Sequence, residues 1–106
     1  MTGKRPRVSA AKLDELIAEA TVDCYNEEEQ LTGLFTLIGD NLVLPFETNV
    51  LGVPVTVASV DLTAGGIVAI CQRDGVRQAT PLLELPLPAP APSGAEWIEA
   101  YRRWAG

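Results

Sequence analysis

The chain of 106 residues contains no histidine and only two cysteines, Cys24 and Cys71. Without histidine, no side chain has an ordinary pKa near neutrality at which it could act as a general base. A zinc site would need two or more carboxylate ligands, which is uncommon. The two cysteines are far apart in the sequence and form no CxxC pair. We expect both to be small buried hydrophobic residues rather than a disulfide.

Basic residues are also scarce, with 8 against 14 acidic residues and a net charge of -6. Apart from the tail Lys4–Arg7 there is no basic stripe, so we expect no nucleic-acid partner. No apolar run approaches the roughly 20 residues that span a bilayer. The first residues are not followed by the apolar region of a signal peptide. The sequence therefore predicts a cytoplasmic protein with no membrane partner.

Catalytic motifs are missing as well. The sequence has no nucleophile elbow, no phosphate-binding glycine loop and no dinucleotide fingerprint. Gly65-Gly66 fits a hairpin turn better than a phosphate cradle. A pair of carboxylates could hydrolyse a glycoside, but a chain this short offers no obvious cleft for a sugar. We expect the protein not to be an enzyme.

The N-terminal half of the chain has a helical pattern. We expect residues 1–8 to form a disordered basic tail and residues 9–106 to form a single domain. Ser9 is suited to cap a helix, and the apolar period then continues to about Asn41. This pattern predicts one long helix over residues 9–42.

That helix has two weak points and a definite end. The β-branched and acidic residues at Thr21–Asp23, and Gly33, lower the helix propensity locally, so a kink or break would fall at one of them. Pro45 ends the helix because the residue before a proline is driven from the helical region.

From Phe46 onward the apolar period changes to two, which is typical of strands. Asp74-Gly75 is a strong signal for a two-residue hairpin. Several short strands with tight turns indicate a small antiparallel SH3-like barrel over residues 46–85. The predicted fold class is α+β, with the long helix packed on this barrel. The predicted strands are Phe46–Val50, Val53–Val60, Ile67–Arg73 and Val76–Pro81, with a short segment at Leu82–Leu85.

The C-terminal part begins with a proline-rich segment, residues 86–92, which must be extended. Ser93 is suited to cap a last short helix over residues 94–104. At helical spacing, Trp97, Tyr101 and Trp104 share one face of that helix.

Acidic residues interrupt the apolar stripe of the predicted long helix. On a heptad, Glu27 or Glu28 falls on the otherwise apolar face, one turn after Asp23. A carboxylate that faces a core is costly unless it is paired, hydrogen-bonded or bound to a metal. Because few basic residues are present to pair with it, the pattern favours a hard cation such as calcium.

A second set of oxygen ligands lies where the helix should stop. Asp40 and Asn41 would sit beside helical carbonyls without partners, at the negative end of the helix dipole. Glu47 follows in the first predicted strand and Asp61 at the end of the second. Calcium takes six to eight oxygen ligands of these kinds. No stretch of the chain matches an EF-hand loop.

These two sets cannot share one ion on a straight helix. Asp40 follows Asp23 by seventeen residues, which corresponds to about 25 Å at 1.5 Å per residue. We therefore expect the main site at the helix end, with Asp40, Asn41 and Glu47 and a possible contribution from Asp61. Asp23, Glu27 and Glu28 would form either a second, weaker site or a buried cluster held by arginines of the barrel.

The same residues carry a resemblance to a known family. Asp23-Cys24-Tyr25 with Glu27–Gln30, then Asp40–Leu42 with Pro45-Phe46, resemble the D-x-Y-x-x-E-E-Q and D-x-L-x-[FL]-P-F patterns of the bacterial CcbP-like calcium-binding proteins. The resemblance covers about residues 13–62. It implies a small α+β protein without EF-hands that buffers or senses cytosolic calcium.

The alternative is an interaction module without metal. Small SH3-like barrels often bind peptides. The proline-rich segment 86–92 would then dock on the chain's own barrel or attract a partner, and Trp97 with Trp104 would offer a contact face.

Overall fold

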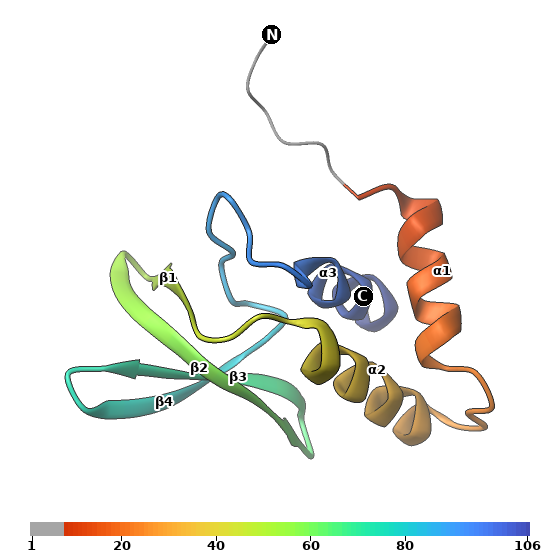
Figure 1. Ribbon diagram of the computed structural model, residues 1–106. Coiled ribbons are helices and arrows are strands. Elements are labelled where there is room, and N and C mark those ends of the chain that lie inside the picture. Colours follow the sequence, from red (N-terminus) through yellow and green to blue (C-terminus); the bar gives the residue numbers. More distant parts are fainter. Residues whose placement is uncertain (1–7) are drawn as a thin grey trace, which may run out of the picture.

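The computed structural model describes residues 8–106, and the α+β class predicted from the sequence is observed. Helices and strands are segregated along the chain, with a C-terminal helix returning to the first two (Figure 1). The predicted tail falls mostly on residues 1–7, which lie outside the described part. The elements are α1 Ala10–Ala20, α2 Glu27–Asn41, β1 Phe46–Val50, β2 Val53–Thr63, β3 Gly66–Arg73, β4 Val76–Pro81 and α3 Ala95–Ala105.

The single long helix over residues 9–42 is wrong, because the chain breaks at the first of its two weak points. Ser9 caps α1 as predicted, accepting from the Lys12 N–H at 3.1 Å. After Ala20 the backbone turns, and Asp23 adopts a left-handed conformation with φ 62°. Short polar side chains favour such turns because they offer the backbone alternative hydrogen bonds.

A capping box starts the second helix. The Asn26 side chain accepts from the Glu29 N–H at 2.8 Å, and the Glu29 carboxylate accepts from the Tyr25 N–H at 2.7 Å. Two otherwise unpartnered donors are thereby satisfied. The loop and this cap reset the helical register, so the apolar stripe predicted for a continuous helix does not pass from α1 into α2.

Gly33 allows the two helices to approach closely. A Cβ atom at this position would overlap the Ala20 carbonyl oxygen at the end of α1. The buried residues of the helix pair are Leu16 and Ala20 on α1 and Leu34 and Ile38 on α2. Gly33 is thus the contact point of a helical hairpin.

The sheet is open, so the predicted SH3-like barrel over residues 46–85 is also wrong. The four strands form an antiparallel meander in the order β1-β2-β3-β4, with no pairing between β1 and β4. Residues 82–84, expected as part of a strand, form a turn that leads the chain back to the helices. The helices cover one part of the apolar inner face, which therefore becomes buried without closure of the sheet.

The two faces of the sheet differ in character. Residues opposite each other in the strand register share a face. Val57, Ile67, Ala69 and Cys71 are buried on the inner face. The outer face carries a polar row across all four strands, in which the cross-strand neighbours are Glu47, Thr56, Gln72 and Arg77.

The C-terminal helix lies in the core. Trp97 is 5% exposed, and the Tyr101 hydroxyl accepts from the Ile67 N–H at 3.2 Å. Trp104 is half-buried, and its indole N–H donates to Gln30 at 2.9 Å. Gly94, with φ 88°, stands at the N-cap where Ser93 was expected. The face of Trp97 and Trp104, which was considered as a contact face for a partner, therefore packs largely within the protein's own fold.

The proline-rich segment folds back onto the domain. The buried Thr48 hydroxyl donates to the Pro86 carbonyl at 2.6 Å, and the Val43 N–H donates to the Ser93 carbonyl at 2.9 Å. Leu87 packs against the core. The start of the proline-rich segment therefore packs on the domain itself. No helix within residues 8–106 is long and apolar enough to cross a membrane.

Candidate functional site

The predicted main site at the end of α2 is only partly assembled. Asp40 and Asn41 are both exposed there. The Asn41 amide N–H donates to the Leu37 carbonyl at 2.8 Å, and the Leu42 N–H donates to the Ile38 carbonyl at 2.8 Å. Two carbonyls of the last turn therefore already have partners. Asp40 lines none of the main hollows found among residues 8–106.

Glu47 and Asp61 do not come together. Glu47 is exposed on the outer face of β1, opposite Thr56 of β2. Asp61 lies five residues beyond Thr56 on the same strand, which is about 15 Å away at the usual rise per residue. Its carboxylate accepts from the adjacent Leu62 N–H at 2.8 Å. Asp61 is therefore not a ligand of an ion bound at Glu47.

Asp23, Glu27 and Glu28 are exposed, so the expectation of a carboxylate facing the core is wrong. The reason is the break between the helices, which places Glu27 and Glu28 in the first turn of α2 rather than on a continuous stripe. Carboxylates are favourable there because the helix dipole is positive at its N-terminus.

The buried cluster held by arginines is likewise not observed. Arg73 pairs with Asp74 at 3.9 Å, and Arg103 pairs with Asp14 at 2.7 Å. Between residues 8 and 106 these are the two ion pairs found, and no group of three or more acidic or cysteine side chains is arranged to hold a metal. Any cation site must therefore combine one or two carboxylates with neutral oxygens or water.

Such neutral oxygens lie around one carboxylate of the other set, Glu28 at the start of α2. A hollow of about 580 Å³ lies between the start of α2 and the β2–β3 turn. Glu28, Asn26 and Thr32 line it from α2 and its cap, and Thr63 lines it from the turn. The Thr32 and Thr63 hydroxyls donate to the carbonyls of Glu28 and Gly66. The Thr63 oxygen also accepts from the Gly65 N–H at 3.2 Å, so it keeps one lone pair available to a cation. No feature of the sequence indicated that α2 and the β2–β3 turn would meet.

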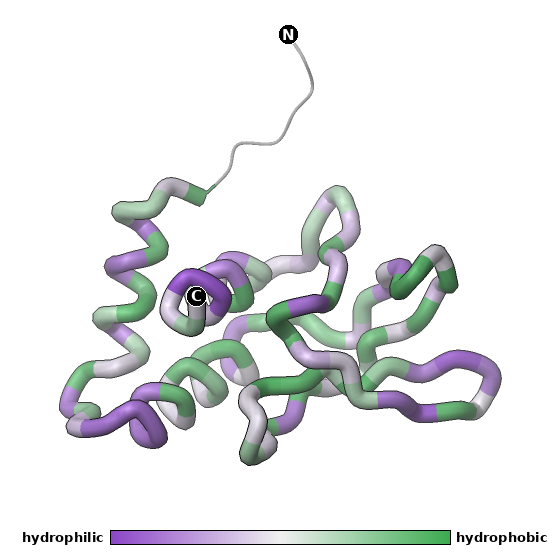
Figure 2. The backbone as a smooth tube through the Cα atoms, turned by 180° about the vertical axis from the view of Figure 1, so that it is seen from behind, coloured by the Kyte–Doolittle hydropathy of each residue, from purple (hydrophilic) through white to green (hydrophobic). Residues whose placement is uncertain are grey.

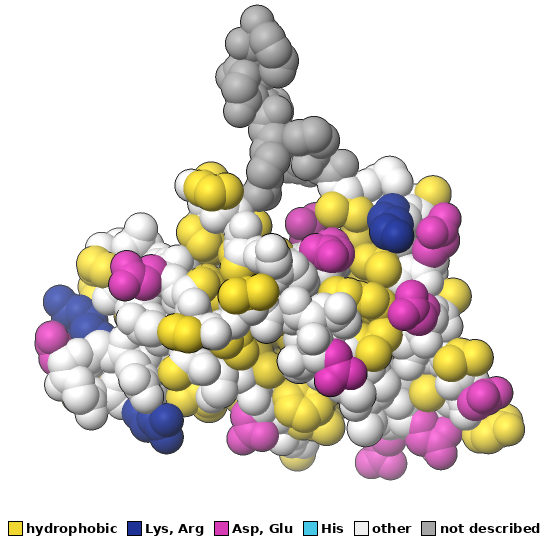
Figure 3. Space-filling model, in the orientation of Figure 1, with side chains coloured by type: hydrophobic (Ala, Val, Ile, Leu, Met, Phe, Trp, Pro, Cys, Tyr) yellow, Lys and Arg dark blue, Asp and Glu magenta, His cyan; other side chains and the backbone are white. Residues whose placement is uncertain are grey.

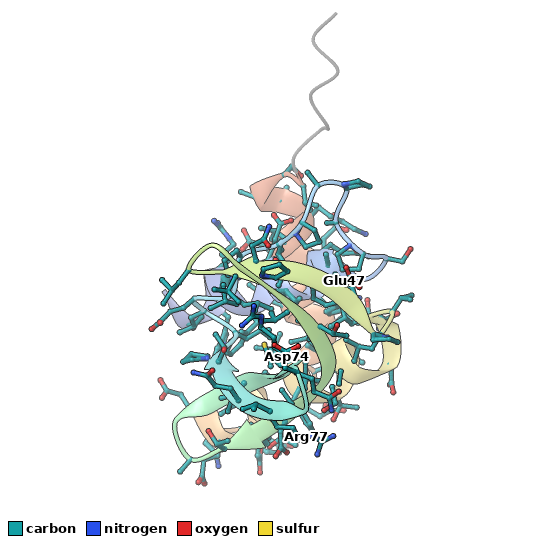
Figure 4. The ribbon with its side chains drawn as sticks, turned by 90° about the vertical axis from the view of Figure 1, so that its left-hand side faces the viewer. Glu47, Asp74 and Arg77 are labelled. Atoms are coloured by element: carbon teal, nitrogen blue, oxygen red, sulfur yellow. The ribbon has the colours of Figure 1, made fainter. Side chains whose placement is uncertain are left out.

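The charges are distributed unevenly over the surface. Acidic side chains gather over the α1–α2 side of the molecule in Figure 3, whereas the arginines of the β3–β4 hairpin lie at the opposite end. Glu47 and Arg77 lie well apart on the sheet, with Asp74 between them in the view of Figure 4. The three strand spacings that separate Glu47 from Arg77 amount to about 14 Å, too far for an ion pair.

The arginines of α3 are occupied within the fold. The Arg102 guanidinium donates to the carbonyls of Leu82 and Leu85, and partial burial lowers its pKa. The hydrogen bond with Asp14 raises the pKa of Arg103, and the same bond lowers the pKa of Asp14. Neither arginine neutralises the carboxylates at the start of α2.

A second hollow was also missed by the sequence reasoning. It lies on the inner face of the sheet, beyond the helices, with a volume of about 410 Å³. The β1–β2 turn beside it is hydrophobic in Figure 2, whereas the β3–β4 turn is hydrophilic. The only available signal was Leu51, a large apolar residue in a turn, which is 96% exposed. The apolar residues that line the hollow are Val50, Leu51, Val53, Val55, Cys71 and Val76.

Comparison with family models, with curated proteins and with solved structures finds no match to this chain. The resemblance to CcbP-like proteins therefore stays a prediction from the sequence.

Proposed function

We propose that the protein is a calcium-binding protein without EF-hands, and that the ion binds in the hollow at the start of α2. The observation that carries the proposal is the convergence there of oxygen atoms from two elements, with Glu28 as the uncommitted carboxylate. The net charge of -6 supports it, because a negative field attracts cations. Asp23 and Glu27 lie on the adjacent loop and first turn and add to this field.

This placement differs from the main site predicted at Asp40, Asn41 and Glu47. The helix end has the more favourable dipole for a cation, but Asp40 and Asn41 line none of the main hollows found among the described residues. In either place the ion would have few carboxylate ligands and would remain partly hydrated. We therefore expect a dissociation constant on the order of 10⁻⁴–10⁻³ M, the weak end of protein calcium sites. A protein of this affinity responds to large rises in calcium.

Calorimetric titration and thermal unfolding with calcium, with magnesium as the comparison ion, test the proposal. Binding to the native state at 10 mM calcium should stabilise it by about 1.4 to 2.7 kcal/mol for that range of affinity. The domain should fold without the ion because its core is apolar. An unchanged melting curve together with no heat would exclude calcium binding.

Three matched substitutions locate the ion. Glu28→Gln should remove most of the calcium-induced shift, whereas Asp40→Asn and Glu15→Gln should retain it. Each change removes one charge and keeps the size of the side chain. Glu29→Gln would not serve as a control, because Glu29 caps α2 and its substitution would change the stability of the helix. Loss of the shift in Asp40→Asn alone would place the ion at the helix end.

A further inference from the structure

The β4 strand has a free edge. Asp74 and Gly75 have φ angles of 52° and 79°, which identify a type I′ turn. That turn bonds Arg73 to Val76, and in an antiparallel pair the bonded positions alternate. The N–H and C=O groups of Arg77 and Ala79 therefore point away from β3. No backbone partner for them is found within residues 8–106.

The other edge of the sheet is not free in the same way. Leu87, Pro88 and Ala89 lie beside Glu47 and Asn49 of β1 around a small hollow. The Thr48 hydroxyl fixes this segment through the Pro86 carbonyl. An added strand would therefore find its place at β4, which lies at the lower left in Figure 1.

The inner face next to β4 is uncovered and partly apolar, with Arg73 and Gln78 on the same face as Val76. The hollow of about 410 Å³ reaches β4 at Val76 and Gln78. Val76 is 65% exposed and Val53 36% exposed, although both lie on the face that is buried further along the sheet. A strand added to β4 would point every second side chain toward this hollow, where an apolar side chain would cover exposed surface.

The outer face next to β4 is basic. With its amide oxygen turned toward the guanidinium, Gln72 accepts from Arg77 Nε at 2.9 Å and Nη2 at 3.1 Å. These bonds hold Arg77 on the outer face and leave further N–H groups free. A carboxylate on an added strand, opposite Arg77, would form a charge-assisted cross-strand pair.

We propose that the β4 edge binds an extended segment of a partner protein in which apolar and acidic residues alternate. The segment would become a fifth strand, with its apolar side chains over the hollow and its carboxylates beside Arg77. A second copy that pairs through its own β4 is less suitable, because Val76–Pro81 contains no carboxylate that could pair with Arg77.

Fluorescence anisotropy with a labelled octapeptide of alternating valine and glutamate tests this proposal in calcium-free, low-salt buffer, so that its result does not depend on the metal site. Binding should saturate and be at least tenfold tighter than that of the valine–lysine peptide. Arg77→Glu should reverse this preference, and Val76→Asp should weaken binding at least fivefold. Glu15→Gln should leave binding unchanged.

Removal of the outward donors tests the strand pairing itself. Ala79→Pro removes one outward N–H without removing a bond to β3 and should abolish binding. A valine–glutamate peptide methylated at alternate amides should fail on the unaltered protein, which keeps the test valid if the proline variant is unstable. Absence of saturation at millimolar peptide, or equal binding of the methylated peptide, would overturn the proposal. So would a concentration-dependent dimer in sedimentation velocity that Ala79→Pro disrupts.

Discussion

Gly33→Ala should destabilise the protein, although alanine is the better helix former. Helix propensity alone favours the change by about 1 kcal/mol. The new Cβ would overlap the Ala20 carbonyl oxygen, which is backbone and cannot move to another rotamer. Overpacking of this kind costs up to about 3 kcal/mol. We therefore expect a net loss of about 2 kcal/mol in the free energy of unfolding.

Gly39→Ala on the same helix is the matched control. A Cβ at Gly39 would meet no atom within 4 Å, so this variant should gain up to about 1 kcal/mol. Urea unfolding followed by far-UV circular dichroism measures both values. In a thermal scan, the loss at Gly33 should lower Tm by roughly 8–16 °C. Equal stabilisation of the two variants would refute the close contact of α1 with α2 and would favour the continuous helix.

Three further changes test the remaining contacts. Tyr101→Phe should cost about 1–3 kcal/mol in urea unfolding, since it leaves the buried Ile67 N–H without its acceptor. Arg102→Met should cost at least about 2 kcal/mol in the same assay, because two carbonyls of the turn after β4 lose a charged donor. Arg103 holds the pKa of Asp14 below its ordinary value of 3.8, so Asp14 stabilises the fold at neutral pH. The stability difference between the wild type and Asp14→Asn should therefore be present at pH 7 and disappear as the pH falls through that lowered pKa.

Features that depend on a few neighbouring residues were predictable. The Ser9 cap, the turn at Asp74-Gly75 and the bounds of β1 and β4 are observed as predicted. Each follows from local chemistry, namely a side-chain oxygen near an unpartnered N–H or a backbone conformation that glycine allows.

The candidate site was less predictable, because ligands can be recognised singly but their distances depend on the fold. The carboxylates at the start of α2 were noted from the sequence, but they were assigned to the wrong surface of the helix. The contribution of Thr63 to the same hollow required the β2–β3 turn to lie against α2. Nothing in a single sequence shows that Glu28 and Thr63 lie close together.

The tertiary structure decided how the elements are joined. The local helix propensities favour a break at Thr21 over a continuous helix, or the reverse, by only about 1 kcal/mol. The larger effect is the burial of apolar surface when α2 folds back on α1. Closure of the sheet was decided in the same way, since α2 and α3 cover its inner face and remove the need for a barrel. The sequence by itself determined the Ser9 cap, the Asp74-Gly75 turn and the bounds of β1 and β4, because these depend on neighbours along the chain. Only long-range burial determined which faces met and which edge stayed open.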